Sequence, residues 1–168
     1  YMKHFGAPWY YGHLYRLLYP RFDAIVCQSR DMQQDMVATF AIPLEKTVLL
    51  PNPVDVQAIR EQAAASPPPL SDARRNLLAM GRLVPRKGFD LLLRAVQELD
   101  DPECHLTLLG EGKCHTELEE LTQELGIEKR VTFAGFQQNP APYLAGADVF
   151  VLSSLYEGFP NVVLEAMA

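Results

Sequence analysis

Two glutamates near the end of the sequence, Glu157 and Glu165, lie on either side of a Gly-Phe-Pro turn where a buried strand gives way to a helix. Glu157 falls in the loop, and Pro160 suits the first turn of the helix. Glu165 lies about one turn inside that helix, so both carboxylates can face one crevice. A helix carboxylate can accept hydrogen bonds from a ribose diol, while the loop carboxylate reaches a hexose on the same diphosphate. The pattern therefore suggests a site for a sugar nucleotide.

A basic loop earlier in the sequence offers the charges that a diphosphate requires. Arg82 and Lys87 lie between Gly81 and Gly88, directly after a predicted buried strand. The planar guanidinium of Arg82 can bind two phosphate oxygens, and the Lys87 ammonium can neutralise a third. A solvated surface loop is the alternative interpretation. We expect Arg86, in the same loop, to point outward.

The whole sequence alternates short apolar runs with amphipathic stretches. Strands are predicted at residues 23–29, 47–50, 77–80, 105–109, 131–134 and 149–152. Helices are predicted at residues 30–40, 56–65, 89–99 and 116–125, with a short helical turn at 142–145. This order predicts an α/β fold with a Rossmann-like parallel sheet flanked by helices.

Parallel sheets of this kind bind ligands beyond the carboxyl ends of their strands. The loops at Gly81, Gly110, Gly135 and Ser153 should therefore gather on one edge of the sheet. The glycine-flanked turn that begins at Gly110 is as typical of a simple connection as of a ligand contact. The loop after Gly135 either presents backbone groups to a base or places Phe136 in the core.

Composition restricts the class of protein. A hydrophobic content of 48% with 21% charged residues is what a globular core needs. The formal net charge of −6 argues against broad electrostatic binding to nucleic acid. The sequence shows neither a spanning apolar run of about 20 residues nor a signal peptide, so a cytoplasmic location is the default expectation. The three cysteines predict free thiols.

Four segments together resemble the C-terminal donor domain of retaining family 4 glycosyltransferases of the GT-B fold. These segments are residues 81–88, 108–112, 131–136 and 157–166. Residues 23–29 and 51–55 look like the end of that family's N-terminal domain and the crossing to the second domain. The resemblance implies that residues 1–50 form the end of the Rossmann-like, acceptor-side domain. Residues 51–55 would be a hinge, and residues 56–168 a truncated donor-binding domain.

The sequence is expected to be a fragment of a longer protein, an incomplete GT-B molecule that is inactive by itself. It starts without a methionine and stops within a predicted helix that has no C-cap signal.

The resemblance also implies roles for single residues at the donor site. Arg82 and Lys87 would bind the donor diphosphate, and Glu165 would bind the ribose hydroxyls. Phe136 would contact the base through its backbone.

At the reacting sugar, the resemblance implies that Glu157 is the catalytic carboxylate and contacts the transferred sugar. Backbone groups of Gly158, Phe159 and Asn161 would contact the sugar and phosphates. The family commonly works without a metal, so no cofactor and no metal site are expected.

The implied function is transfer of a sugar, with retained configuration, from a nucleoside diphosphate sugar to a hydroxyl of a glycan or lipid-linked saccharide. Two alternatives stay open: a non-catalytic module that binds nucleotide sugars, and a sugar-nucleotide epimerase of similar fold. Polysaccharide or lipopolysaccharide biosynthesis would be the setting of the transferase. Nucleic acid is not an expected partner.

The first residues of the sequence form an aromatic patch beside basic residues. It contains Phe5, Trp9, Tyr10, Tyr11, Tyr15 and Tyr19 next to Lys3, Arg16 and Arg21. Such a patch is typical of contact with a lipid-linked acceptor at the inner face of a membrane, and equally of a packed amphipathic helix. His4 and His13 are candidates for the family's N-terminal histidine only because they are present.

Overall fold

The computed structural model describes residues 10–70, 75–99 and 101–168, and the chain divides into two compact units, Tyr1–Pro53 and Val54–Ala168. We call them the N-terminal unit and the C-terminal unit. In the described part of the chain, no helix combines the length and the apolar character needed to cross a membrane.

The N-terminal unit contains, in chain order, α1 (Tyr10–Leu18), β1 (Ile25–Cys27), α2 (Arg30–Phe40) and β2 (Thr47–Leu49). The two strands pair in parallel, with Ile25 opposite Thr47. Ser29 caps α2 as predicted, because its Oγ accepts a hydrogen bond from the backbone N–H of Met32 at 3.1 Å.

Tyrosines of the predicted aromatic patch pack against α2. The ring of Tyr15 stacks on that of Tyr19 with centroids 5.1 Å apart, and Tyr19 meets the buried Phe40 edge-on at 5.0 Å. Packing therefore accounts for Tyr15 and Tyr19. Four residues named in the predictions for this region lie outside the described residues: Lys3, His4, Phe5 and Trp9.

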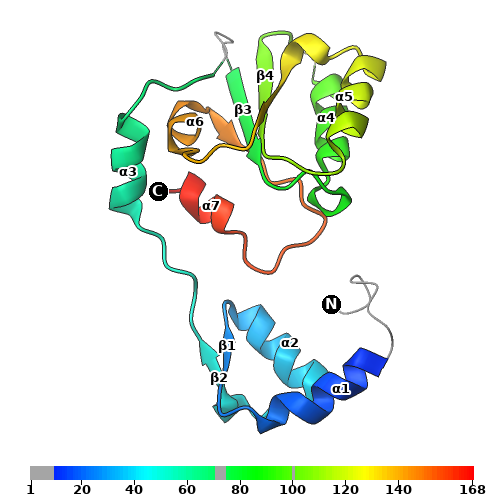
Figure 1. Ribbon diagram of the computed structural model, residues 1–168, viewed down its shortest axis with the longest axis vertical. Coiled ribbons are helices and arrows are strands. Elements are labelled where there is room, and N and C mark those ends of the chain that lie inside the picture. Colours follow the sequence, from blue (N-terminus) through cyan, green and yellow to red (C-terminus); the bar gives the residue numbers. More distant parts are fainter. Residues whose placement is uncertain (1–9, 71–74, 100) are drawn as a thin grey trace. The chain divides into compact units, whose positions relative to one another are not determined.

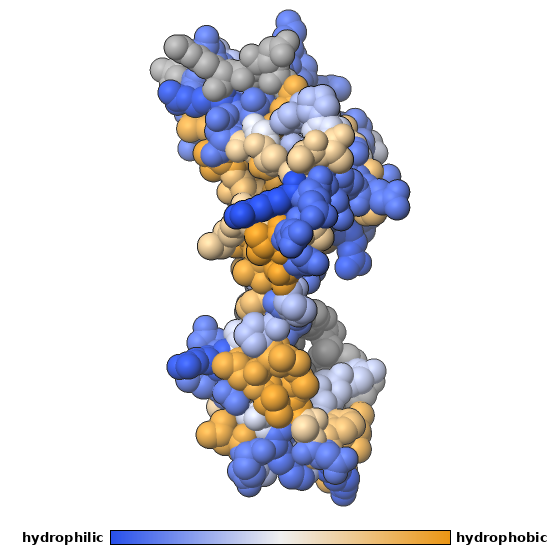
Figure 2. All heavy atoms as spheres, turned by 90° about the vertical axis from the view of Figure 1, so that its left-hand side faces the viewer, coloured by the Kyte–Doolittle hydropathy of each residue, from blue (hydrophilic) through white to orange (hydrophobic). Residues whose placement is uncertain are grey.

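One face of the small sheet in the N-terminal unit is exposed. Val26 and Val48 are register partners on this face and are 52% and 47% exposed. In Figure 2, the face of the N-terminal unit that is turned toward the viewer carries apolar surface. The buried Cys27 lies on the opposite face.

The C-terminal unit alternates strands and helices, as predicted. Its elements are α3 (Val56–Ala64), β3 (Arg75–Met80), α4 (Phe89–Glu98), β4 (Cys104–Leu109), α5 (His115–Glu124), β5 (Val131–Gly135), α6 (Ala141–Gly146), β6 (Val149–Phe150) and α7 (Asn161–Ala166). Among the described residues, four strands form a parallel sheet in the order β5-β4-β3-β6.

Helices cover both faces of this sheet (Figure 1). On one face, Leu93 of α4 and Leu118 of α5 join the fully buried Leu106 of β4 in the larger core cluster. On the other face, Leu78 of β3 packs in a second cluster with Val162 of α7 and residues of α6. The double covering explains why the central strands are apolar on both faces.

The loops that follow β3, β4 and β5 converge at the carboxyl edge, as predicted. Gly81 N–H donates to the carbonyl of Leu109 at 2.9 Å, and Gly110 N–H donates to the carbonyl of Gly135 at 2.7 Å. The β4–β5 register shifts between Leu108 and Leu109, so that Leu109 pairs with Gly135. An irregularity of this kind bends a strand locally.

Two predicted boundaries near the site were wrong. Strand β6 ends at Phe150 rather than at residue 152, because the chain turns toward the basic loop, where Ser153 Oγ donates to the carbonyl of Lys87 at 2.8 Å. Pro160 precedes α7 as its N-cap instead of lying in its first turn, and its ψ of 96° keeps it extended.

Gly110 allows the close approach of these loops, and its replacement should be costly. It has a φ of 133°, and a Cβ at this position would collide with the carbonyl oxygen of Gly81. We expect Gly110→Ala to lower the free energy of unfolding by about 3–5 kcal/mol, from backbone strain and overpacking together. Chemical denaturation measures the loss.

The matched control is Gly126→Ala. Gly126 also has a positive φ, 65°, but an added Cβ would meet no atom within 4 Å. Gly126→Ala should lower the free energy of unfolding by about 1–2 kcal/mol, the cost of a left-handed backbone conformation in alanine. Equal losses in the two variants would show that the loops can separate without cost.

Candidate functional site: a cavity at the carboxyl edge of the sheet

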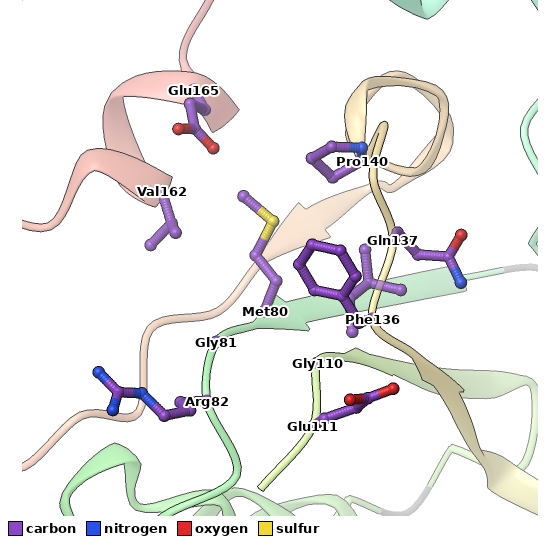
Figure 3. Close-up of a pocket in the computed structure, with 11 residues that line it drawn as sticks. Met80, Gly81, Arg82, Gly110, Glu111, Phe136, Gln137, Pro140, Val162 and Glu165 are labelled. Atoms are coloured by element: carbon purple, nitrogen blue, oxygen red, sulfur yellow. The ribbon is translucent and has the colours of Figure 1, made fainter.

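Three of the predicted site residues, Arg82, Phe136 and Glu165, line a cavity of about 450 Å³ in the C-terminal unit. Its walls come from the ends of β3 and β4, from the loops that follow β3, β4 and β5, and from α7 (Figure 3). The lining residues are Met80, Gly81, Arg82, Leu109, Gly110, Glu111, Phe136, Gln137, Pro140, Val162 and Glu165. A mostly apolar wall with a few charged groups is typical of a small-molecule site.

The structure brings Arg82 and Glu165 to this one cavity. Arg82 follows Gly81 at the end of β3, and Glu165 lies on α7 on the same helix face as Val162 (Figure 3). A cation and a carboxylate from segments some 80 residues apart therefore face the same space.

Lys87 lies beside the cavity rather than in its wall. It ends a short 3-10 turn, Pro85–Lys87, and its Cε would be 3.2 Å from a Cβ placed on Gly81. Gly88, with a φ of 61°, follows; a Cβ there would collide with the carbonyl oxygen of Ser153. The close packing of these two loops directs the Lys87 side chain along the backbone that lines the cavity.

Lys87 and Glu157 form the closest ion pair at the site. Lys87 Nζ donates to Glu157 Oε1 at 2.6 Å, and the two side chains are only 13% and 17% exposed. This contact ties the loop after β3 to the loop after β6. Glu157 therefore has a specific partner, as a buried carboxylate requires.

The pKa of the Glu157 carboxyl is lowered from its ordinary value. Burial raises this pKa, but the hydrogen bond from Lys87 and the charges of Lys87 and Arg86 outweigh it. The Ser154 hydroxyl lies close enough to favour the charged carboxylate as well, although its buried Oγ falls short of hydrogen-bond geometry with the described residues. Glu157 is therefore an anion at neutral pH.

The expectation that Arg86 points outward was wrong. Its Nη1 lies 3.8 Å from Glu157 Oε2, and its guanidinium lies over the Tyr156 ring, 5.6 Å from the centroid. The backbone N–H of Leu155 donates to the Arg86 carbonyl at 2.9 Å and joins the two loops at this residue. No local pattern indicated this position, because the partner loop follows some 70 residues later.

Phe136 is not a core residue. Its side chain is 69% exposed, and the ring faces the cavity near Met80 (Figure 3). The neighbouring Gln137 is held by its own loop, since its Nε2 donates to the carbonyl of Ala134 at 2.6 Å. The side chain of Phe136, and not only its backbone, is therefore available to a ligand.

Other predicted contacts lie outside the cavity wall. Gly158, Phe159 and Asn161 are described but do not line it; from the same segment, Val162 and Glu165 do. Glu111 lines the cavity although the sequence favoured no role for it. Its place directly after Gly110, in a loop assigned to the ligand edge, was the signal that could have identified it.

Formal charges at the site balance. Three basic side chains, Arg82, Arg86 and Lys87, face three carboxylates, Glu111, Glu157 and Glu165. Of the three cations, Lys87 and Arg86 already have Glu157 as a partner, so an anionic ligand would compete with that carboxylate for them.

Two models of protein families match this chain. The family model described as "Glycosyl transferases group 1" matches residues 74–168, and the model described as "Glycosyltransferase Family 4" matches residues 2–58. The chain belongs to the group 1 glycosyl transferases. The resemblance seen in the sequence is thereby confirmed.

Two curated relatives illustrate the similarity. The chain is 36% identical over 155 residues to the N-acetylgalactosamine-N,N'-diacetylbacillosaminyl-diphospho-undecaprenol 4-alpha-N-acetylgalactosaminyltransferase of Campylobacter jejuni, a match that covers 92% of this chain and 41% of the relative. It is 47% identical over 92 residues to the lipopolysaccharide core biosynthesis glycosyltransferase LpsE of Rhizobium meliloti, covering 55% of this chain and 26% of the relative.

Solved structures show the same architecture, the GT-B fold. The lipopolysaccharide outer core galactosyltransferase WaaB in its apo form has a TM-score of 0.68 and 27% identity, covering 86% of this chain and 40% of that one. Anabaena HepE in complex with UDP has a TM-score of 0.81; at 22% identity, over 99% of this chain and 48% of that one, it shows the fold alone. The chain spans less than half the length of each of these four proteins.

The Lys87–Glu157 pair should make stability depend on pH in the acidic range. The pKa of Glu157 is lower in the folded state than its ordinary value of 4.5, so the carboxylate stabilises the fold above that pH. This contribution is lost as the pH falls through the folded-state pKa. We expect Glu157→Gln to lower the free energy of unfolding by about 1–3 kcal/mol at pH 7 and progressively less below pH ~4.5.

Urea denaturation between pH 3 and pH 7 measures this difference. Glu98→Gln, on the exposed end of α4, is the control and should change stability by less than about 0.5 kcal/mol at every pH. A Glu157→Gln difference that stays constant across this range would contradict the pairing.

Proposed function

We propose that the full-length protein transfers a sugar from a nucleoside diphosphate sugar to a hydroxyl of a glycan or lipid-linked saccharide, with retention of configuration. The observation that carries the proposal is the convergence of Arg82 and Glu165 on one cavity, with the Lys87–Glu157 pair beside it. Membership in the group 1 glycosyl transferases supports the reaction class.

The donor would lie across the carboxyl edge of the sheet. Its diphosphate would contact Arg82 and Lys87, the two cations nearest to Gly81, and its ribose hydroxyls would donate to Glu165. The base would extend toward Phe136, whose exposed ring and backbone lie on the opposite side of the cavity from Arg82 (Figure 3). The volume of about 450 Å³ suits the nucleotide part of such a donor.

The transferred sugar would lie near Glu157, where the loops after β3 and β6 meet. In the reaction the bond between the sugar C1 and the β-phosphate oxygen breaks, and a bond from the acceptor oxygen to C1 forms on the same face. The acceptor proton passes to the leaving phosphate. Arg82 and Lys87 would stabilise the negative charge that develops on this phosphate, a role that a metal ion fills in other enzymes.

Gly158, Phe159 and Asn161 would take part only at the sugar end of this arrangement. Gly158 and Phe159 lie in the loop that connects Glu157 to α7, Asn161 begins α7, and none of the three lines the nucleotide cavity. Their backbone contacts to the sugar and phosphates therefore require that the donor extend beyond the cavity toward Glu157.

The names of the relatives support the class of acceptor. The name of the Campylobacter jejuni relative includes a diphospho-undecaprenol acceptor, and the name of LpsE refers to lipopolysaccharide core biosynthesis. We propose a lipid-linked or lipopolysaccharide acceptor for this protein too, reached from the cytoplasmic side at the membrane surface.

Single substitutions in the full-length protein separate chemistry from binding. Glu157→Gln and Lys87→Ala should each lower kcat at least about 100-fold, because they remove charge next to the reacting sugar and the leaving phosphate. Glu165→Ala should instead weaken donor binding about 10-fold or more, because the ribose loses a charged hydrogen-bond acceptor. Steady-state kinetics and calorimetry with UDP and GDP measure both effects.

Lys113→Ala and Glu128→Ala, two exposed positions of the same unit, are the controls and should behave as wild type. Wild-type rates in all three site variants would refute the assignment. Screening a panel of nucleoside diphosphate sugars identifies the donor. Donor binding without transfer to any acceptor would indicate a binding module, and conversion of the donor without an acceptor would indicate an epimerase.

A further inference from the structure

The Glu157 carboxylate is shared between two basic side chains of one loop. Lys87 Nζ contacts Oε1 at 2.6 Å, and Arg86 Nη1 lies 3.8 Å from Oε2. Within the described part of the chain, these are the cations placed within 4.0 Å of Glu157. Each carboxylate oxygen thus has its own positive neighbour.

Arg86 has contacts besides Glu157. Its carbonyl accepts a hydrogen bond from Leu155 N–H at 2.9 Å, and its guanidinium lies over the Tyr156 ring at 5.6 Å from the centroid. A cation over an aromatic ring is attracted to its face. The Arg86 side chain, 32% exposed, therefore has a contact beside Glu157 that does not involve Lys87.

Lys87 has a second task if the proposed function is right. Its side chain runs along Gly81, which lines the cavity, so a short movement brings Nζ to an anion bound there. A diphosphate carries more negative charge than one carboxylate and attracts the ammonium more strongly. When Lys87 turns to the diphosphate, Glu157 would be left as a mostly buried anion without its closest partner, which is costly.

We infer that Arg86 is a positioning residue, which holds the Glu157 carboxylate in place when Lys87 turns from Glu157 to the donor diphosphate. The inference rests on the proposed function and assigns a separate task to each of the two adjacent cations. Arg86 itself touches neither the nucleotide nor the phosphates. Its guanidinium would move toward Oε2 and take over the charge that Lys87 had balanced.

Kinetics of the full-length protein test this assignment. Arg86→Gln should lower kcat about 10-fold while the KM for the donor changes less than about 2-fold, because the sugar is bound but Glu157 is misplaced. The acid limb of the kcat–pH profile should move to higher pH, since the loss of a nearby cation makes Glu157 easier to protonate. Arg86→Lys should recover most of kcat, and Arg94→Gln, exposed on α4, should change nothing.

Different results would overturn the inference. A higher donor KM with unchanged kcat would make Arg86 a donor ligand, and unchanged kinetics would leave it without a role in transfer. A loss of kcat that Arg86→Lys does not recover, with no shift of the pH profile, would indicate a purely structural effect.

A second measurement needs neither donor nor activity. Thermal unfolding of Arg86→Gln, Glu157→Gln and the double variant gives the coupling between the two residues. The same cycle in a Lys87→Met background imitates the departure of Lys87, with Lys87→Gln as the substitute should Lys87→Met not fold. The coupling, expressed as a ratio of unfolding constants, should rise about threefold or more when Lys87 is absent.

An equal or smaller coupling in the Lys87 variant would overturn the assignment of Arg86 directly. This outcome is distinct from a failure of the proposed function. Absence of UDP and GDP binding and of transfer in the wild-type protein would refute the function, while the coupling would still decide whether Arg86 replaces Lys87 at Glu157.

Discussion

The site depends on the contact between Lys87 and Glu157. Their 2.6 Å ion pair joins the loop after β3 to the loop after β6 at a point where both side chains are largely withdrawn from water. Removing two charges from water costs several kcal/mol each, which the mutual attraction and further hydrogen bonds must offset. Close backbone packing at Gly88 and the bond from Ser153 Oγ to the Lys87 carbonyl keep the two loops together. The backbone therefore places the two charged side chains next to each other.

The parallel sheet supplies the second constraint. Because β3, β4 and β5 all end at one edge, their loops form one wall, and α7 returns to complete it with Val162 and Glu165. The result is a largely apolar cavity whose wall carries one cation, Arg82, and two carboxylates, Glu111 and Glu165, with the Lys87–Glu157 pair beside it. Under the proposed function, a bound diphosphate would draw Lys87 away from Glu157, its partner in the absence of a ligand.

Much of this could be predicted from the sequence because it depends on local patterns. Ser29 caps α2 as expected. The strands and helices of the C-terminal unit alternate as predicted, because each apolar run can be recognised from the local sequence alone. The general rule for parallel sheets then placed the loops at Gly81, Gly110 and Gly135 together. The side-chain positions of Arg86 and Phe136 were harder to predict. The direction of each side chain depends on what the rest of the fold packs beside it.

By itself, the sequence determined the order of the elements, the class of fold and the family, since these are encoded in periodicity and in short motifs. Only the tertiary structure decided which charges are neighbours. Lys87 and Arg86 share Glu157 because β3 and β6 are adjacent in the sheet, although they are far apart in the chain. Ion pairs act over a few ångströms, and distances of that size between remote segments are set by packing of the whole unit rather than by any local pattern.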